Sequence, residues 1–407
     1  MLGALMFDYN YVVVDLETTI KAPSPHFGAT PHHPDNWIVM LGYAWSDGRT
    51  GTVTQEGIKD FIKDLEYANA REFTVLVAHN LAFDLAYLLK HHDLHGLQYW
   101  DTQKFHYMQM NRLAIQPSLE SVANAWKIPF KKDVEVKERF KAGIGSDEID
   151  EDLLREYLEE DVRVTEQIFL QQKNYSLSIN SDRPSKSDYY LRYIKQHMKA
   201  VEITTRMACE GIGFDVQAAT EEYNKVLDSL ELINKSLMES WSQYYPKDAD
   251  TPFNPSSPSQ IETLLWGGTV KISSQETVLD SQGNPVRYKT GKKAGEIKTK
   301  RVTKEVRVPK LVSDKTVKTF KSRGWEMKSG AHTLENVAKY DEGLGAKLAK
   351  EVRELRDQSK SVNTYYQPYI KHSIDGVIYP QYHHTVTATG RLSSSKPNMQ
   401  NISGKGK

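Results

Sequence analysis

The sequence predicts an α/β domain in its N-terminal part, followed by a mainly helical region. Residues 1 to about 178 alternate apolar, β-branched runs with helical patterns, as an α/β fold requires. Residues 189 to about 245 and 331 to 370 are helical in pattern, and a polar segment at 171–188 is expected to be a linker. With 407 residues, the chain is long enough for two or three domains, each with its own core.

The composition is that of an ordinary soluble protein, with 39% hydrophobic and 26% charged residues. One cysteine, Cys209, excludes a disulfide framework and favours a reducing compartment, so we expect a cytoplasmic location. The apolar residues 1–7 lack a basic flank and are too few to cross a bilayer, which argues against a signal peptide or a membrane anchor. The histidine pairs at 32–33, 91–92 and 383–384 have no cysteines at zinc spacing, so we interpret them as surface or turn residues.

The first acidic motif follows a predicted strand near the start of the sequence. Residues 11–14 read Tyr-Val-Val-Val, an aromatic and β-branched run that predicts a buried strand. Asp15 and Glu17 come directly after it. Because side chains two apart on a strand share a face, these two carboxylates can point together from the end of the strand.

Two further acidic motifs fall on predicted helices. Residues 75–78 form another apolar strand, and the helical segment that follows carries Asn80 and Asp84, which we expect one turn apart on one helix face. Tyr157 and Asp161 have the same spacing within a long helical pattern. Each pair is therefore aligned locally, and the fold has only to bring three short segments together.

These residue types suit a site for two divalent metal ions. Carboxylate oxygens are preferred ligands of hard cations such as Mg²⁺ or Mn²⁺. Two such ions about 3.5–4 Å apart lower the pKa of an attacking water and stabilise the departing oxygen of a phosphodiester. A tyrosine beside them can orient that water by hydrogen bonding. One such motif alone is usually a solvated surface or a helix cap, but three in this order favour a phosphodiesterase.

The ordered set resembles the DEDD superfamily of 3′–5′ exonucleases, in the subclass marked by a tyrosine in the third motif. The resemblance implies a ribonuclease H-like exonuclease domain over residues 1–178, with a mixed sheet flanked by helices. It implies two bound metal ions and the following roles: metal ligands Asp15, Glu17, Asp84 and Asp161, water-positioning Tyr157, and DNA contacts from Thr18 and Asn80. Asp101-Thr102 also resembles a family dipeptide, but a strand-end turn or a helix cap explains it equally well, so we do not assign it to the site.

A second signature lies near the C-terminal end. Residues 387–402, TATGRLSSSKPNMQNI, closely resemble the segment that opens the palm of family A DNA polymerases, the group of bacterial DNA polymerase I. In that family the segment follows the minor groove of the primer–template, which implies DNA contacts by Arg391, Asn398 and Gln400. Every base pair presents acceptors in the minor groove, so such contacts check pairing geometry without reading sequence. The structural alternative is a Ser- and Gly-rich loop before a tail.

Weaker similarities between the two signatures keep the order found in the family. They imply a helical thumb over residues 189–375 and the first strands of a palm over 376–407. Lys360 and Thr364 lie one turn apart on the helix that returns from the thumb, where they could hold adjacent phosphates. Such contacts position a duplex without specifying its sequence.

The formal net charge is zero, but the charges are unevenly distributed. Residues 133–161 hold twelve acids and four bases, whereas residues 286–328 hold fifteen Lys and Arg and four Asp and Glu. Valine alternates with charge through residues 302–308, which predicts an exposed β-hairpin within a thumb insertion at about 267–328. A basic hairpin favours a clamp on duplex phosphates with a strong salt dependence. A solvated loop and a docking site for a processivity protein are the alternatives.

The resemblance also implies parts that the sequence lacks. Family A polymerases carry their nucleotidyl-transfer carboxylates and a nucleotide-binding helix beyond the segment that here ends near Lys407. We therefore expect polymerase activity only with a separate or missing C-terminal half, such as a second chain that carries the palm and fingers. The sequence has no 5′-nuclease region before Asp15. In this it resembles bacteriophage polymerases, which implies a location in the cytoplasm of a bacterial host.

The sequence thus predicts a DNA replication protein with proofreading exonuclease activity. Two other functions stay open: a stand-alone 3′–5′ exonuclease in repair or nucleotide salvage, and a non-catalytic DNA-binding subunit. The five clustered residues argue against the non-catalytic subunit, because adjacent carboxylates repel phosphate unless a metal ion neutralises them.

Overall fold

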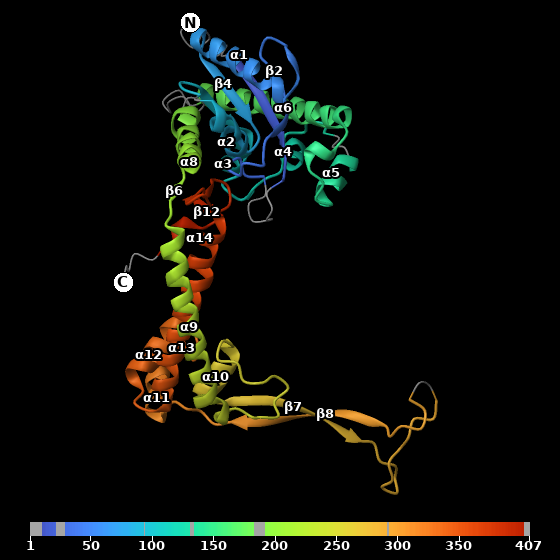
Figure 1. The fold of residues 1–407 in the computed structure, drawn as a ribbon, viewed down its shortest axis with the longest axis vertical. Coiled ribbons are helices and arrows are strands. Elements are labelled where there is room, and N and C mark those ends of the chain that lie inside the picture. The colour runs from blue at the N-terminus through green and yellow to red at the C-terminus, as the bar shows by residue number, and fades with distance from the viewer. Residues whose placement is uncertain are drawn as a thin grey trace. The chain divides into compact units, whose positions relative to one another are not determined.

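The computed structural model describes residues 10–21, 29–92, 94–130, 134–182, 192–290 and 293–402. The chain forms two compact units (Figure 1). The first combines Met1–Val216 with Pro368–Lys407, and the second is Gln217–Gln367. The second unit is therefore an insertion in the sequence of the first.

A mixed five-stranded sheet forms the centre of the first unit. Its strands, in spatial order, are β3 (Thr50–Thr54), β2 (Ile38–Trp45), β1 (Asn10–Thr18), β4 (Thr74–Ala78) and β5 (Gln98–Asp101). The central strand β1 pairs antiparallel with β2 and parallel with β4. The valines of β1 and β4 are fully buried, as expected for central strands that are covered on both faces.

Helices flank this sheet, which confirms the predicted mixed α/β architecture (Figure 1). The described helices of this part are α1 (Ile58–Arg71), α2 (Leu81–His91), α3 (Thr102–Gln109), α4 (Leu119–Ala125), α5 (Val134–Lys141), α6 (Glu151–Asp182) and α8 (Lys199–Glu210), with a π-helical turn at Tyr193–Met198 before α8. The long helix α6 packs closely on β2 at Gly42, where an added Cβ would lie 2.8 Å from Leu158 Cγ. A glycine there lets helix and sheet approach each other.

The prediction of a linker at 171–188 is wrong for its first part, because α6 continues to Asp182. Residues 183–188 lie outside the described residues. A polar residue of this stretch, Gln172, is satisfied inside the protein. Gln172 is fully buried, accepts a hydrogen bond from Trp100 Nε1 (2.9 Å) and donates one to the Thr102 carbonyl (3.0 Å). Polar composition therefore did not mark a loop here.

Short strands connect the two sequence segments of the first unit. The helix α8 ends at Gly211, whose φ of +70° is in the left-handed region that glycine favours. Strand β6 (Ile212–Gly213) then pairs with β10 (Val377–Ile378), which also pairs with β9 (Ser373–Ile374). The palm strand expected over 376–382 is split into β10 and β11 (Gln381–His383), and β11 pairs with β12 (Ser393–Ser395). Pro380, which lacks an N–H group, lies at the break.

The second unit is mainly helical. Its helices are α9 (Val216–Trp241), α10 (Pro258–Trp266), α11 (Asp314–Ser322), α12 (Ala331–Tyr340) and α13 (Leu344–Lys360), followed by a π-helical turn, Ser361–Tyr366, and by α14 (Gln367–His372) at the boundary. Their core includes Trp241, Phe320 and Leu348, all nearly or fully buried. Among the described residues of both units, every helix is too short or too polar to cross a lipid bilayer.

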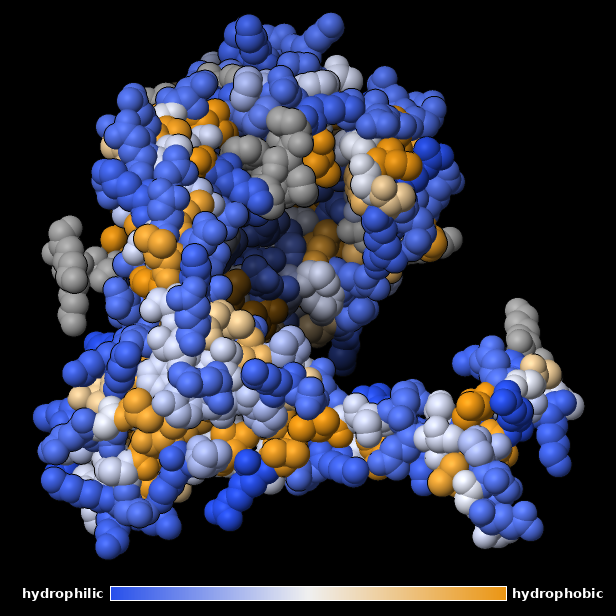
Figure 2. Space-filling model, turned by 60° about the horizontal axis from the view of Figure 1, so that its bottom comes forward, coloured by the Kyte–Doolittle hydropathy of each residue, from blue (hydrophilic) through white to orange (hydrophobic). Residues whose placement is uncertain are grey.

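A two-stranded hairpin extends from the helices of this second unit (Figures 1 and 2). Strands β7 (Gly268–Thr277) and β8 (Thr299–Val308) pair antiparallel along their whole length, as the alternation of valine and charge predicted. Val270 and Val306 lie opposite each other on one face, while Arg301 and Arg307 lie on the other. Helix α11 follows within the segment expected at about 267–328, so the basic region is a hairpin and a helix.

Candidate functional site

Strand β1 presents Asp15 and Glu17 on one face at its C-terminal end. Both are half-buried, whereas Leu16 between them is buried on the opposite face. The Glu17 carboxylate accepts a hydrogen bond from Ser146 Oγ at 3.0 Å, which fixes its position. The shared face predicted for the two carboxylates is therefore present.

Asp84 lies in the first turn of α2 and is 2% exposed. Its Oδ1 accepts a hydrogen bond from the Leu16 backbone N–H at 3.1 Å, which ties α2 to the strand that carries the first two acids. Burial, and then the negative charges of Asp101 and Glu17, raise the pKa of Asp84 well above its usual range. The carboxylate is thus held beside Glu17 in a place that disfavours an uncompensated negative charge.

Asn80 is not on the helix face that the sequence predicted. It precedes α2 in the left-handed conformation, with φ of 67° and ψ of 48°. Asparagine tolerates this region better than most residues, and the Asn80 N–H is held by Asp101 Oδ1 at 3.1 Å. Asp101 also caps α3 by accepting from the N–H groups of Gln103 and Lys104, so the helix-cap interpretation of this residue is confirmed.

Helix α6 contributes Tyr157 and Asp161, which are 7% and 6% exposed. The Tyr157 hydroxyl hydrogen bonds to Asp161. Burial, followed by the negative charges of Asp161, Glu17 and Asp15, raises the pKa of Tyr157 above its usual value. The hydroxyl therefore keeps its proton across the neutral range and is surrounded by carboxylates from two elements.

The fold thus brings β1, α2 and α6 together around Asp15, Glu17, Asp84, Tyr157 and Asp161. The donor set fits hard divalent cations, because it offers carboxylate oxygens whose mutual repulsion a cation would relieve. Within the described ranges, no three His, Cys, Asp or Glu side chains stand close enough to hold one ion.

Thr18 lies in a different environment from the acids. It is 5% exposed and follows a register shift after Glu17. The Thr18 side chain is therefore largely covered by the protein. The proposed role of Thr18 stays a prediction.

The segment with the palm signature folds against α3. The Tyr107 hydroxyl donates to the Thr387 carbonyl at 2.6 Å, and Arg112 Nη1 donates to the Thr389 carbonyl at 3.1 Å. Lys104 Nζ lies 3.0 Å from His384 Nδ1, and burial lowers the pKa of Lys104 to about 8. The contacts that Tyr107, Arg112 and Lys104 make with this segment were not predicted. These residues lie on or beside a short helix that carries no recognisable motif, so the sequence gives no signal for the contacts.

Within this segment, the three predicted DNA-contacting side chains differ in exposure. Arg391 and Gln400 are exposed, whereas Asn398 is half-buried. Asn398 Oδ1 accepts from the Gln400 N–H (3.1 Å) and from Ser394 Oγ (3.2 Å). Its amide nitrogen is therefore the atom that can donate to a ligand.

In the second unit, Lys360 is the last residue of α13, and Thr364 falls in the π-helical turn that follows. The wider turn of a π-helix alters the one-turn alignment that the spacing predicted. Lys360 is exposed, and Thr364 is half-buried. Their contacts with phosphate stay a prediction.

Residues 287–407 match the sequence model of the family described as DNA polymerase family A. Among solved structures, the fold is similar to the POL domain of Pol1 from M. smegmatis in complex with DNA primer-template and dNTP, with a TM-score of 0.59 and 14% sequence identity. The alignment covers 98% of this chain and 53% of that chain, so this chain spans about half the length of the structure it matches. No curated protein matches it significantly. The resemblance to family A polymerases is thus confirmed for the fold and for residues 287–407.

Proposed function

We propose that this chain binds DNA and removes nucleotides from 3′ ends by metal-dependent hydrolysis, as the proofreading part of a family A DNA polymerase. The observation that carries the proposal is the gathering of four carboxylates and Tyr157 from β1, α2 and α6. The match of residues 287–407 to the family A model and the fold similarity support the link to a polymerase.

Each residue of the proposed site has its own role in the hydrolysis. Asp15, Glu17, Asp84 and Asp161 would hold the cations, which when bound lower the pKa of the attacking water and offset the charge on the leaving oxygen. The Leu16 N–H and the Ser146 hydroxyl orient Asp84 and Glu17. Tyr157 keeps its proton, so it does not act as a base, and its hydroxyl orients the water by hydrogen bonding.

The test is the double substitution Asp15→Ala and Glu17→Ala in the full chain. It should leave DNA binding intact and abolish degradation of a labelled single-stranded 3′ end in Mg²⁺ or Mn²⁺. The matched control removes two exposed carboxylates of α6, with Glu156→Ala and Glu159→Ala, and should degrade DNA at the wild-type rate. Undiminished degradation by the first variant would contradict the site.

A wild-type chain that binds DNA but shows no degradation at any metal concentration would favour the non-catalytic alternative. The second chain with the remaining polymerase parts is a further proposal. Co-purification of such a chain, and nucleotide incorporation by the pair but not by this chain, is the result expected for it.

A further inference from the structure

The turn at residues 387–391, which ends at Arg391, is held by side chains of α3 and of the loop that follows α3. Within the turn, the Gly390 N–H donates to the Thr387 carbonyl at 3.0 Å, and Thr387 Oγ1 donates to the Arg391 carbonyl at 2.8 Å. From outside the turn, Tyr107 and Arg112 donate to two of its carbonyl groups. These two residues lie 280 and 277 positions before the carbonyls that they hold. The conformation of the turn therefore depends on a distant part of the sequence.

Arg112 and Gly390 fit closely against each other. Gly390 has a φ of +73°, and a Cβ added to it would lie 2.7 Å from Arg112 Cζ. Arg112 itself has a φ of 67°, in the left-handed region that few residues other than glycine and asparagine adopt readily. Such a backbone conformation persists only where the surrounding structure holds it. The Arg112 guanidinium thus lies against the backbone of the residue that precedes Arg391.

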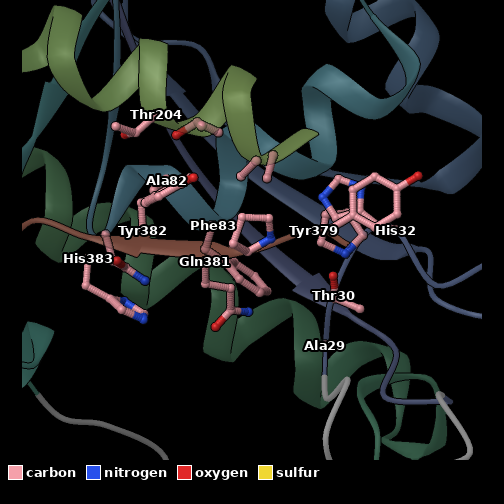
Figure 3. Close-up of a pocket in the computed structure, with 16 residues that line it drawn as sticks. Ala29, Thr30, His32, Ala82, Phe83, Thr204, Tyr379, Gln381, Tyr382 and His383 are labelled. Carbon is pink, nitrogen blue, oxygen red and sulfur yellow. The ribbon is translucent and has the colours of Figure 1, made fainter. Parts of the chain in front are cut away.

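The segment that leads into the turn is fixed as well. Strand β11 lines a pocket together with Thr204 of α8 (Figure 3). The residue after this strand, His384, is held on both sides, because its Nε2 bonds to Thr204 Oγ1 at 2.8 Å and its Nδ1 to Lys104 Nζ at 3.0 Å. The carbonyl of Thr385 then accepts from the Gln116 N–H at 3.0 Å. The backbone is therefore positioned before it enters the turn.

The side chain of Arg391 has the opposite character. It is exposed, and within the described residues its guanidinium has no hydrogen-bond or ion-pair partner. A long side chain of this kind has many rotamers, and binding costs entropy when it becomes ordered. A fixed backbone lowers that cost, because only the side chain has to be ordered when a ligand binds.

We propose that Tyr107 and Arg112 are positioning residues, which hold the turn so that Arg391 reaches the minor groove of a DNA duplex. The inference rests on the proposed function, because the contact of Arg391 with DNA is itself a proposal. It adds a role for α3 that neither sequence signature indicated. Asp101, which caps α3, also holds the Asn80 N–H, so one helix supports both this turn and the start of α2.

The experiment measures the affinity of the full chain for two primer–template duplexes in EDTA, so that no hydrolysis occurs. One duplex has adenines at the last positions of the primer strand, and the other has 3-deazaadenines there. The analogue pairs with thymine but lacks N3, the acceptor that adenine presents in the minor groove. Because both duplexes carry the same phosphates, the ratio of their dissociation constants reports the minor-groove contact and not a general loss of charge.

Four variants separate the contributions. Tyr107→Phe removes one donor to the turn without a change in charge, and Arg112→Ala removes the other donor. Arg391→Ala removes the proposed contact itself. Arg49→Ala, at an exposed arginine between β2 and β3, is the matched control for the loss of one positive charge.

The wild type and Arg49→Ala should bind the adenine duplex about tenfold more tightly than the 3-deazaadenine duplex, and Arg391→Ala should bind the two equally. Tyr107→Phe and Arg112→Ala should reduce the preference to about threefold or less, because a mobile turn no longer directs the side chain. Tyr107→Phe combined with Arg391→Ala should weaken binding of the adenine duplex no more than Arg391→Ala alone, since both act on one contact.

A full preference in both Tyr107→Phe and Arg112→Ala, together with its loss in Arg391→Ala, would overturn the positioning role and retain the DNA contact. No preference in the wild type, or a preference that persists in Arg391→Ala, would overturn both. The proposed nuclease activity is tested separately by the Asp15→Ala and Glu17→Ala variant, whose assay does not depend on the minor groove.

Discussion

Asp84 shows how one buried residue links the structure of the site to its chemistry. Its carboxylate holds the Leu16 N–H, yet its raised pKa means that the ionised form is disfavoured in the fold. When the pKa of an acid is higher in the folded state than in the unfolded state, the protein loses stability as the pH rises through the unfolded-state pKa. Without metal, the charge of Asp84 therefore lowers the stability of the protein at neutral pH.

We predict that Asp84→Asn leaves the urea midpoint in EDTA at pH 7.5 unchanged or raises it, because the amide oxygen still accepts from Leu16 without a charge. The same variant should lose at least about 100-fold in 3′-end degradation, because the proposed metal site loses one of its four carboxylates and changes in outer-shell partners alone cost up to about 100-fold. Asp84→Ala, which removes the acceptor as well, should lower the midpoint. Equal destabilisation by the two variants would show that the charge is not the unfavourable element.

Tyr157 gives a prediction about pH dependence. Its raised pKa keeps the hydroxyl protonated well beyond neutral pH, so the wild-type rate should show no loss assigned to this tyrosine up to about pH 10. Tyr157→Phe should lower the rate of 3′-end degradation about 10–100-fold with the shape of the pH profile unchanged. A profile that changes its alkaline limb in the variant would mean that Tyr157 titrates and acts as a base.

At the scale of elements, the contact between β2 and α6 determines where the third acidic motif lies. Gly42 pairs with Asp15 in the sheet, and its Cα faces Leu158 and Val162 of the helix that carries Tyr157 and Asp161. A methyl group at this position would push the helix away from the strand. The separation between the acids of β1 and α6 is therefore set by the smallest residue of β2.

Gly42→Ala should cost about 1–3 kcal/mol of unfolding free energy through overpacking. It should also lower 3′-end degradation, because Tyr157 and Asp161 shift with α6. Thermal unfolding and the nuclease assay measure the two effects. Gly213→Ala is the control, since no atom lies within 4 Å of the added methyl group. If Gly42→Ala were as stable and active as this control, the close contact would not determine the site.

The elements that carry the site were largely predictable, because strand and helix periodicity are local properties. The apolar runs indicated β1 and β4, and the 3.6-residue pattern indicated α2 and α6. The left-handed backbone of Asn80 was not predictable, because it depends on Asp101 holding its N–H from another strand. The length of α6 and the contact between Lys104 and His384 were not predictable for the same reason. Gln172 of α6 bonds to Trp100, and Lys104 lies beside His384, and both partners are distant in sequence.

At the scale of the whole molecule, charge separates the chain into acidic and basic regions with no net charge. The basic hairpin exposes Lys298, Lys300 and Arg307 along β8 and at its start. Binding of duplex phosphates by these residues would release counterions and make the affinity depend on salt.

Substituting Lys298, Lys300 and Arg307 with alanine should reduce the slope of log affinity against log salt by up to about 0.9 for each phosphate that these side chains neutralise. Fluorescence anisotropy with a duplex at several salt concentrations measures this slope. The control removes the same number of charges from α11, with Lys315, Lys318 and Lys321 changed to alanine. Equal changes in slope from both triple variants would assign the effect to overall charge, and no change from the hairpin variant would favour the solvated loop.

The pairing of β6 with β10 means that the polypeptide leaves the first unit and returns to it at one place. Ile212 pairs with Ile378, and the Phe214 N–H donates to the Gly376 carbonyl at 2.8 Å. The second unit is therefore an insertion whose two ends follow and precede a pair of adjacent strands, β6 and β10. Gain, loss or exchange of this second unit between related genes would leave the five-stranded sheet of the first unit and its hydrogen bonds continuous.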